Sequence, residues 1–214
     1  MLVGKRMTPN PFTVRDDTAI DEALKLMRDK KIRRLPVLNE KGELVGIVAE
    51  KDVLYASPSP ATSLSIHEIH YLVSRIKVGE IMTKNVITVT DDTPLEEAAR
   101  VMADNQIGAL PVVHDGKLVG IITETDLFKI FLELLGAREP GVRVTMKVLE
   151  GQAMLPQITG AISGLEGHVL ALTTWSGDEP GTRVVTVKVS GVDREKLVSN
   201  IGDLGVEFLD VRES

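Results

Sequence analysis

Two aspartates, Asp52 and Asp126, stand at equivalent positions near the start of a helix that the sequence predicts after a short apolar strand. An ionised carboxylate at such a position can accept hydrogen bonds from two neighbouring ligand hydroxyls. Beside Asp126, Thr123 and Thr125 add hydroxyls and free backbone N–H groups at the helix N-terminus, where anions bind readily. Ala49 replaces the first of these threonines beside Asp52. We therefore expect unequal binding, with Asp126 at the stronger site.

A structural interpretation of the same residues stands beside this one. Thr123 and Asp126 have the spacing of a capping box, so helix capping alone would account for both. Capping and ligand binding are compatible, and the sequence leaves both open.

The aspartates belong to two repeats of one unit, because residues 3–54 reappear with substitutions at 78–128. Each repeat is predicted to run strand, helix, strand, strand, helix. Two repeats are fewer than stacked arrays need, which favours a closed, pseudo-symmetric pair with a cleft between its halves. The predicted boundaries are 1–56 for the first repeat, 57–77 for a linker and 78–136 for the second repeat.

Local signals set the expected elements of the repeats. Thr18 and Thr93 are predicted helix N-caps, with Pro94 at the first helical position. Residues 86–89 are expected to form the first strand of the second repeat. The linker is expected to be partly helical, with His67 and His70 on one helix face. Two histidines without a third ligand are usually structural, so no metal site is predicted.

A separate domain is predicted at 142–214, after the break at Arg138–Gly141. Residues 142–148 alternate apolar and polar as a strand does, and helix-spaced apolar residues such as Leu155 and Leu197 follow at two places. The resulting order, βαββαβ, is ferredoxin-like, and the predicted fold class is α+β.

Composition excludes several functions. A net charge of −6 and an aromatic content of 3% argue against a nucleic-acid surface. The absence of cysteine excludes disulfides and thiolate metal sites. No apolar run is long enough for a membrane span and the N-terminus does not resemble a signal peptide, so we expect a cytoplasmic protein without membrane contact. No nucleophile or phosphate-loop motif is present, which predicts a non-enzyme without a catalytic cofactor.

The repeats resemble the CBS domain, on Val-Gly-x-x-Met-Thr, Leu-Pro-Val and the Gly-apolar-apolar-Thr-x-x-Asp segment, the first two of which recur unchanged. Two such domains in tandem resemble a Bateman module, a family that binds adenine nucleotides or related adenosyl ligands. The C-terminal domain looks like an ACT domain. Together these modules resemble acetoin-utilisation proteins of the AcuB type.

The resemblance implies that the aspartate of one repeat works with the first strand and the Leu-Pro segment of the other repeat. For the main nucleotide site, it implies Thr123, Thr125 and Asp126 with Pro11, Phe12, Ile32, Arg33, Arg34, Pro36 and Lys51. For a second, weaker site, it implies Asp52 with Val86, Ile87, Ile107 and Pro111.

The expected function is that of a non-catalytic sensor whose regulatory ligand is an adenine nucleotide (AMP, ADP or ATP) or another adenosyl compound. An interaction scaffold with vestigial clefts, an amino-acid sensor acting through the ACT-like domain, and a weak nucleotide hydrolase remain alternatives. Open sheet edges in the C-terminal domain and the common association of CBS pairs favour a homodimer, with an unidentified regulated protein as a further partner.

Overall fold

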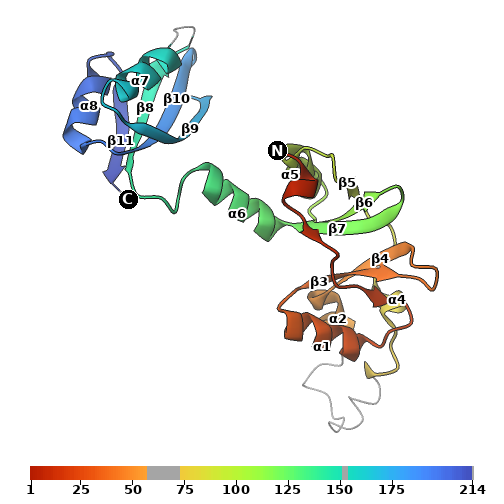
Figure 1. The fold of residues 1–214 in the computed structure, drawn as a ribbon. Coiled ribbons are helices and arrows are strands. Elements are labelled where there is room, and N and C mark those ends of the chain that lie inside the picture. The colour runs from red at the N-terminus through yellow and green to blue at the C-terminus, as the bar shows by residue number, and fades with distance from the viewer. Residues whose placement is uncertain (57–72, 151–153, 214) are drawn as a thin grey trace. The chain divides into compact units, whose positions relative to one another are not determined.

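The computed structural model describes residues 1–56, 73–150 and 154–213. These residues form two compact units, Met1–Leu127 and Phe128–Ser214 (Figure 1). The part of the predicted linker helix that carries His67 and His70 lies outside the described residues.

Both repeats show the predicted order of strand, helix, strand, strand, helix. The first repeat consists of β2 (Val14–Arg15), α1 (Ile20–Lys30), β3 (Arg34–Leu38), β4 (Leu44–Ala49) and α2 (Glu50–Ala56). The second consists of β5 (Val89–Thr90), α5 (Leu95–Asp104), β6 (Ala109–His114), β7 (Lys117–Thr123) and α6 (Glu124–Leu134). Short segments precede them, namely η1 (Val3–Lys5) and β1 (Thr8–Pro9) before the first and α4 (Val78–Ile81) before the second.

The predicted threonine caps are wrong. Helix α5 begins one residue later than expected, with Pro94 as its N-cap. The Thr93 hydroxyl instead accepts a hydrogen bond from the Thr90 backbone N–H at 3.1 Å. Thr18 does the same with the Arg15 N–H in the first repeat. Each hydroxyl therefore closes the turn before the helix, an alternative bond that serine and threonine side chains commonly make.

The first strand of the second repeat is also shorter than predicted. Strand β5 contains Val89 and Thr90, which pair in parallel with Val112 and Val113 of β6. Residues 86–88 precede it without strand structure. Their apolar character reflects the lining of a pocket, described below.

The two repeats exchange their N-terminal segments. The backbone N–H groups of Val3 and Gly4 donate to the carbonyls of Thr93 and Asp91 in the second repeat, at 2.9 and 2.8 Å. The second repeat makes the equivalent two bonds to the first, from Val78 to Thr18 at 2.9 Å and from Gly79 to Asp16 at 2.8 Å.

This exchange extends into the sheets. Strand β1 of the first repeat pairs antiparallel with β7 and completes the four-stranded sheet β1-β7-β6-β5. On the other side, Thr83 forms an antiparallel bridge with Ile47 of β4, next to the three-stranded sheet β2-β3-β4. Val78 of the second repeat is fully buried in the core of the first. Each repeat therefore completes the other.

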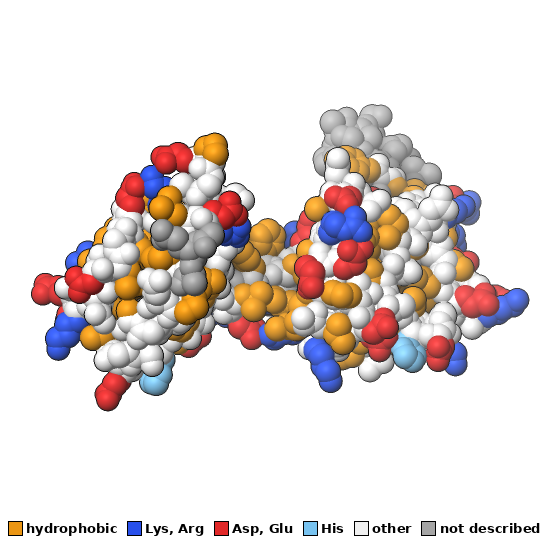
Figure 2. Space-filling view, turned by 90° about the horizontal axis from the view of Figure 1, so that it is seen from above, with side chains coloured by type: hydrophobic (Ala, Val, Ile, Leu, Met, Phe, Trp, Pro, Cys, Tyr) orange, Lys and Arg blue, Asp and Glu red, His pale blue; other side chains and the backbone are white. Residues whose placement is uncertain are grey.

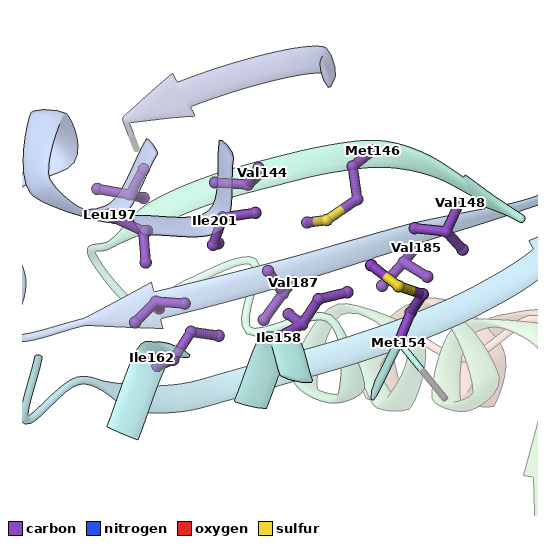
Figure 3. Packing of buried hydrophobic residues seen from close by; sticks show 12 residues of the cluster. Val144, Met146, Val148, Met154, Ile158, Ile162, Val185, Val187, Leu197 and Ile201 are labelled. Carbon is purple, nitrogen blue, oxygen red and sulfur yellow. The ribbon is translucent and has the colours of Figure 1, made fainter. Parts of the chain in front are cut away.

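The second unit has the order β-α-β-β-α-β. Its elements are β8 (Val142–Leu149), α7 (Met154–Ser163), β9 (His168–Ser176), β10 (Thr182–Ser190), α8 (Arg194–Gly202) and β11 (Glu207–Glu213). The strands form one antiparallel sheet in the order β11-β8-β10-β9. Helices α7 and α8 cover one face, where alternate strand residues such as Val144 and Val187 pack against Ile158 and Leu197 (Figure 3). Leu155, one of the helix-spaced apolar residues, is 39% exposed, and the neighbouring Met154 takes the buried position.

Acidic and basic side chains are interspersed on the face shown in Figure 2. No extended basic surface appears in that view, in keeping with the net charge of −6.

Candidate functional site

A pocket of about 200 Å³ lies between the two repeats, beside Asp52. The second repeat contributes two segments to it, one before β5 and one at the start of β6. Its lining residues are Arg34, Ile47, Ala49, Lys51, Asp52, Thr83, Asn85, Val86, Ile87, Gln106, Ile107, Gly108 and Ala109. The structure thus brings Asp52 together with Val86, Ile87 and Ile107, whereas Pro111 is not part of this lining.

Asp52 is half-buried, and one of its two carboxylate oxygens is hydrogen-bonded to a backbone N–H group. Its Oδ2 accepts a hydrogen bond from the Ala49 N–H at 2.8 Å, which caps the start of α2. Among the residues that the structure describes, Oδ1 has no hydrogen-bond donor. That oxygen is available to a ligand hydroxyl in the pocket.

Arg34 and Lys51 line the Asp52 pocket, whereas the sequence analysis assigned both to the Asp126 cleft. Arg34 can lie in this pocket because residue 108 of the second repeat is a glycine. A Cβ atom at Gly108 would overlap the Arg34 guanidinium, so the missing side chain gives the arginine its room. Two of the three predicted cations, Arg34 and Lys51, therefore lie beside the aspartate that lacks the threonine.

Asp126 caps α6 as its spacing predicts. Its Oδ2 accepts hydrogen bonds from the Thr123 N–H at 3.0 Å and from the Thr123 hydroxyl at 2.7 Å. The Asp126 N–H donates back to the same hydroxyl at 3.3 Å. The capping interpretation is therefore confirmed. As for Asp52, Oδ1 has no donor within the described part of the chain.

The remaining six residues of the predicted Asp126 site differ in how far they are exposed to solvent. Phe12 is 49% exposed, and the Lys30 Nζ lies 4.9 Å from the centre of its ring. Arg33 is exposed, and its carbonyl accepts from the Glu50 N–H at 2.9 Å. Thr125 is exposed, Pro11 and Ile32 are half-buried and Pro36 is buried in β3. None of these six residues lines the Asp52 pocket.

The sequence analysis did not identify the polar residues Thr83, Asn85 and Gln106 in the pocket lining. A signal for Thr83 existed, because Met-Thr recurs in both repeats. In the structure the Thr83 backbone exchanges hydrogen bonds with Ile47, at 2.9 and 3.0 Å. This pairing holds the segment that leads to Val86 against the first repeat.

The described residues contain no group of three or more His, Asp or Glu side chains that could hold a metal ion. None of their helices is both long and apolar enough to cross a membrane.

With this geometry, the chain belongs to the CBS domain family, which matches residues 3–59 and 78–133, more than half of the chain. The recognition of a tandem CBS pair is thus confirmed.

Several solved structures are similar to it, among them the following three. The CBS domain pair of protein MJ0100 in complex with 5′-methylthioadenosine and S-adenosyl-L-methionine is 31% identical, covering 65% of this chain and 98% of that one, with a TM-score of 0.52. CBSX2 in complex with AMP is 36% identical, covering 61% of this chain and 96% of that one, with a TM-score of 0.51. A putative acetoin utilization protein (AcuB) from Vibrio cholerae is 32% identical, covering 65% and 96%, with a TM-score of 0.53.

Proposed function

We propose that this protein is a non-catalytic sensor that binds an adenosine ligand in the pocket beside Asp52. The observation that carries the proposal is the composition of this pocket, which combines a carboxylate oxygen without a donor, apolar side chains from the other repeat, and two cations. The ligands named for the similar structures, AMP for CBSX2 and two adenosyl compounds for MJ0100, support the ligand class.

Each part of such a ligand has a matching group. The base would pack against Val86, Ile87 and Ile107, and the ribose hydroxyls would donate to Asp52 Oδ1. A volume of about 200 Å³ lies below the roughly 300–1,000 Å³ of typical ligand pockets. The nucleoside would therefore fill the pocket, and a phosphate would extend across its mouth to Arg34 and Lys51.

A second adenosyl site at Asp126 remains part of the proposal. Its free Oδ1, the Thr125 hydroxyl and the segments around Phe12 and Ile32 support it. Because Arg34 and Lys51 line the Asp52 pocket, we propose that this pocket, and not the Asp126 site, favours phosphate-bearing ligands.

Calorimetric titration with AMP, ADP, ATP, 5′-methylthioadenosine and S-adenosylmethionine tests this function. Saturable binding of at least one compound at one equivalent or more per chain is expected. Failure of all five to bind, together with no rise in unfolding temperature, would favour the scaffold alternative, since a ligand at about 100 times its Kd stabilises by roughly 2.7 kcal/mol. Product formation during prolonged incubation would contradict the non-catalytic assignment.

For the second unit we propose an ACT-type, ferredoxin-like domain in a cytoplasmic homodimer of the AcuB type. Its βαββαβ order and the antiparallel strand order β11-β8-β10-β9 support the fold assignment. The similarity to the Vibrio cholerae protein supports the overall type.

A further inference from the structure

The second unit contains a cavity of about 590 Å³ that shares no lining residue with the Asp52 pocket. It lies on the sheet face opposite α7 and α8, because Thr186 and Lys188 alternate along β10 with buried core residues, and Thr173 and Ala171 of β9 pair with them. The end of α6 and the turn after it, with Phe131 and Leu135, also line it. Its volume lies well inside the range of small-molecule sites.

Lys188 is the buried charge in this cavity. The residue is only 5% exposed, and its Nζ donates one hydrogen bond, to the Gly136 carbonyl at 2.9 Å. Within the described part of the chain, no carboxylate lies within 4.0 Å of this ammonium. An ammonium has three donors, and lysine is almost never this buried unless it is paired. The site is electrostatically incomplete without an anion.

The other charges in the lining indicate how many negative charges the ligand carries. The Arg143 Nη2 and the Arg212 Nε donate to the two oxygens of Asp210, at 2.7 and 2.8 Å. Glu213 also lines the cavity, so the two arginines are balanced by two carboxylates. The one charge left over is that of Lys188. A monoanion matches this surplus, whereas a phosphate dianion exceeds it.

Aromatic and aliphatic side chains indicate the body of the ligand. Trp175 is 48% exposed and Phe131 is 56% exposed, although both are large apolar side chains. With Leu135 and Ala171 they form apolar walls around the buried ammonium. Flat apolar walls of this kind favour a ring or a branched chain.

We propose that this cavity binds a small monocarboxylate with an aromatic or branched apolar body, whose carboxylate pairs with Lys188. This cavity and the Asp52 pocket have no residue in common, so the proposal adds a second ligand site to the one beside Asp52.

Trp175 gives a direct test, because it is the one tryptophan of the chain. Phenylacetate is titrated into the full chain while indole fluorescence is followed, with phenylacetamide as the neutral analogue and phenyl phosphate as the dianion. Phenylacetate is expected to give a saturable change and to bind at least tenfold more tightly than either analogue. No saturable change up to millimolar phenylacetate, or equal binding of phenylacetamide, would overturn the proposal, and tighter binding of phenyl phosphate would refute the monoanion assignment.

Two variants locate the ligand. Lys188→Met is expected to weaken phenylacetate binding at least tenfold, while Lys147→Met, on the same sheet face but outside the lining, leaves it unchanged. Ala171→Leu keeps the lysine but places a larger side chain at the position paired with Lys188, and is expected to weaken binding. Circular dichroism checks that each variant is folded. Wild-type affinity in folded Lys188→Met or folded Ala171→Leu would contradict the assignment.

Discussion

The thioether of Met7, in the first repeat, lies directly against Gly120 in strand β7 of the second repeat. Met82 of the second repeat makes the same contact with Gly46 in β4 of the first. At both glycines a Cβ atom would overlap the methionine sulfur. The recurring methionine and glycine of the two repeats are therefore partners across the pair and not within one repeat.

Gly120→Ala is expected to destabilise the CBS pair by about 1–3 kcal/mol, the usual cost of adding a group to a packed contact. The double-mutant cycle with Met7→Ala supplies the control. Because the smaller side chain removes the overlap, the alanine should cost less in the Met7→Ala background. Urea unfolding followed by circular dichroism measures both. Equal cost of Gly120→Ala in the two backgrounds would show that the methionine contact is not the cause.

Gly160→Ala in α7 is a comparison from the other unit. Apart from the adjoining residues and the backbone of the helix itself, no atom of the described residues lies within 4 Å of a Cβ at this position. Since alanine is the better helix former, this variant is expected to be neutral or more stable by up to about 1 kcal/mol. Marked destabilisation by Gly160→Ala would mean that the space around a glycine does not predict how much its replacement by alanine destabilises the protein.

Asp52→Asn is expected to reduce AMP binding at least tenfold, because it removes the charge that accepts from the ribose hydroxyls. Asparagine keeps an oxygen that can accept from the Ala49 N–H, so the α2 cap is retained. Asp126→Asn is the matched variant and should affect AMP less. If calorimetry showed loss of AMP binding only in Asp126→Asn, the main AMP site would be the Asp126 cleft and not the Asp52 pocket.

Arg34→Ala and Lys51→Ala are expected to weaken AMP binding more than adenosine binding. Both side chains line the Asp52 pocket, and each charge-assisted bond to phosphate contributes about 1.5–3 kcal/mol. Titration of both ligands into each variant measures the difference. Equal losses for adenosine and AMP would show that these cations do not contact phosphate.

The sequence predicted the repeats and their element order because apolar periodicity and turn residues act over short distances. The resemblance predicted that Asp52 and Ile107 belong to one site, and both line the same pocket. The sequence did not predict that Arg34 lines the Asp52 pocket, since the room for this side chain depends on Gly108 of the other repeat, a contact that no local pattern encodes. The exchange of β1 onto β7 and the burial of Lys188 are likewise tertiary properties. Polar residues in strands carried no signal for the cavity of the second unit.

A homodimer is expected at micromolar concentration. In the described part of the second unit, β9 and β11 are the edges of the sheet, and no further strand pairs with them. On the CBS pair, Leu54 and Tyr55 of α2 are 53% and 85% exposed. Open edges and exposed apolar side chains are commonly covered by a symmetric partner. Light scattering that gave the monomer mass of 23.3 kDa would contradict the dimer.

The last prediction concerns pH and His114, whose Nδ1 lies 2.9 Å from the Asp91 Oδ1. The hydrogen bond to Asp91, with the charges of Asp91 and Asp115, raises the pKa of His114 above its usual 6.5. A raised pKa means that the pair stabilises the fold fully below pH 6.5, and that this contribution is lost as the pH rises through the folded-state pKa. The same bond lowers the pKa of Asp91 below 3.8, so the contribution also disappears as strong acid protonates this carboxylate.

Titration of the His114 ring followed by NMR is expected to give a midpoint above 6.5, which Asp91→Asn moves downward. Asp115→Asn should move it less, because the Asp115 carboxylate is 3.7 Å from Nε2 and almost fully exposed to solvent. An unchanged midpoint in Asp91→Asn would show that the bond does not persist in solution. Since the Asp91 carbonyl also accepts from the Gly4 N–H, a lost bond would leave the turn that receives the first repeat held by its backbone contacts.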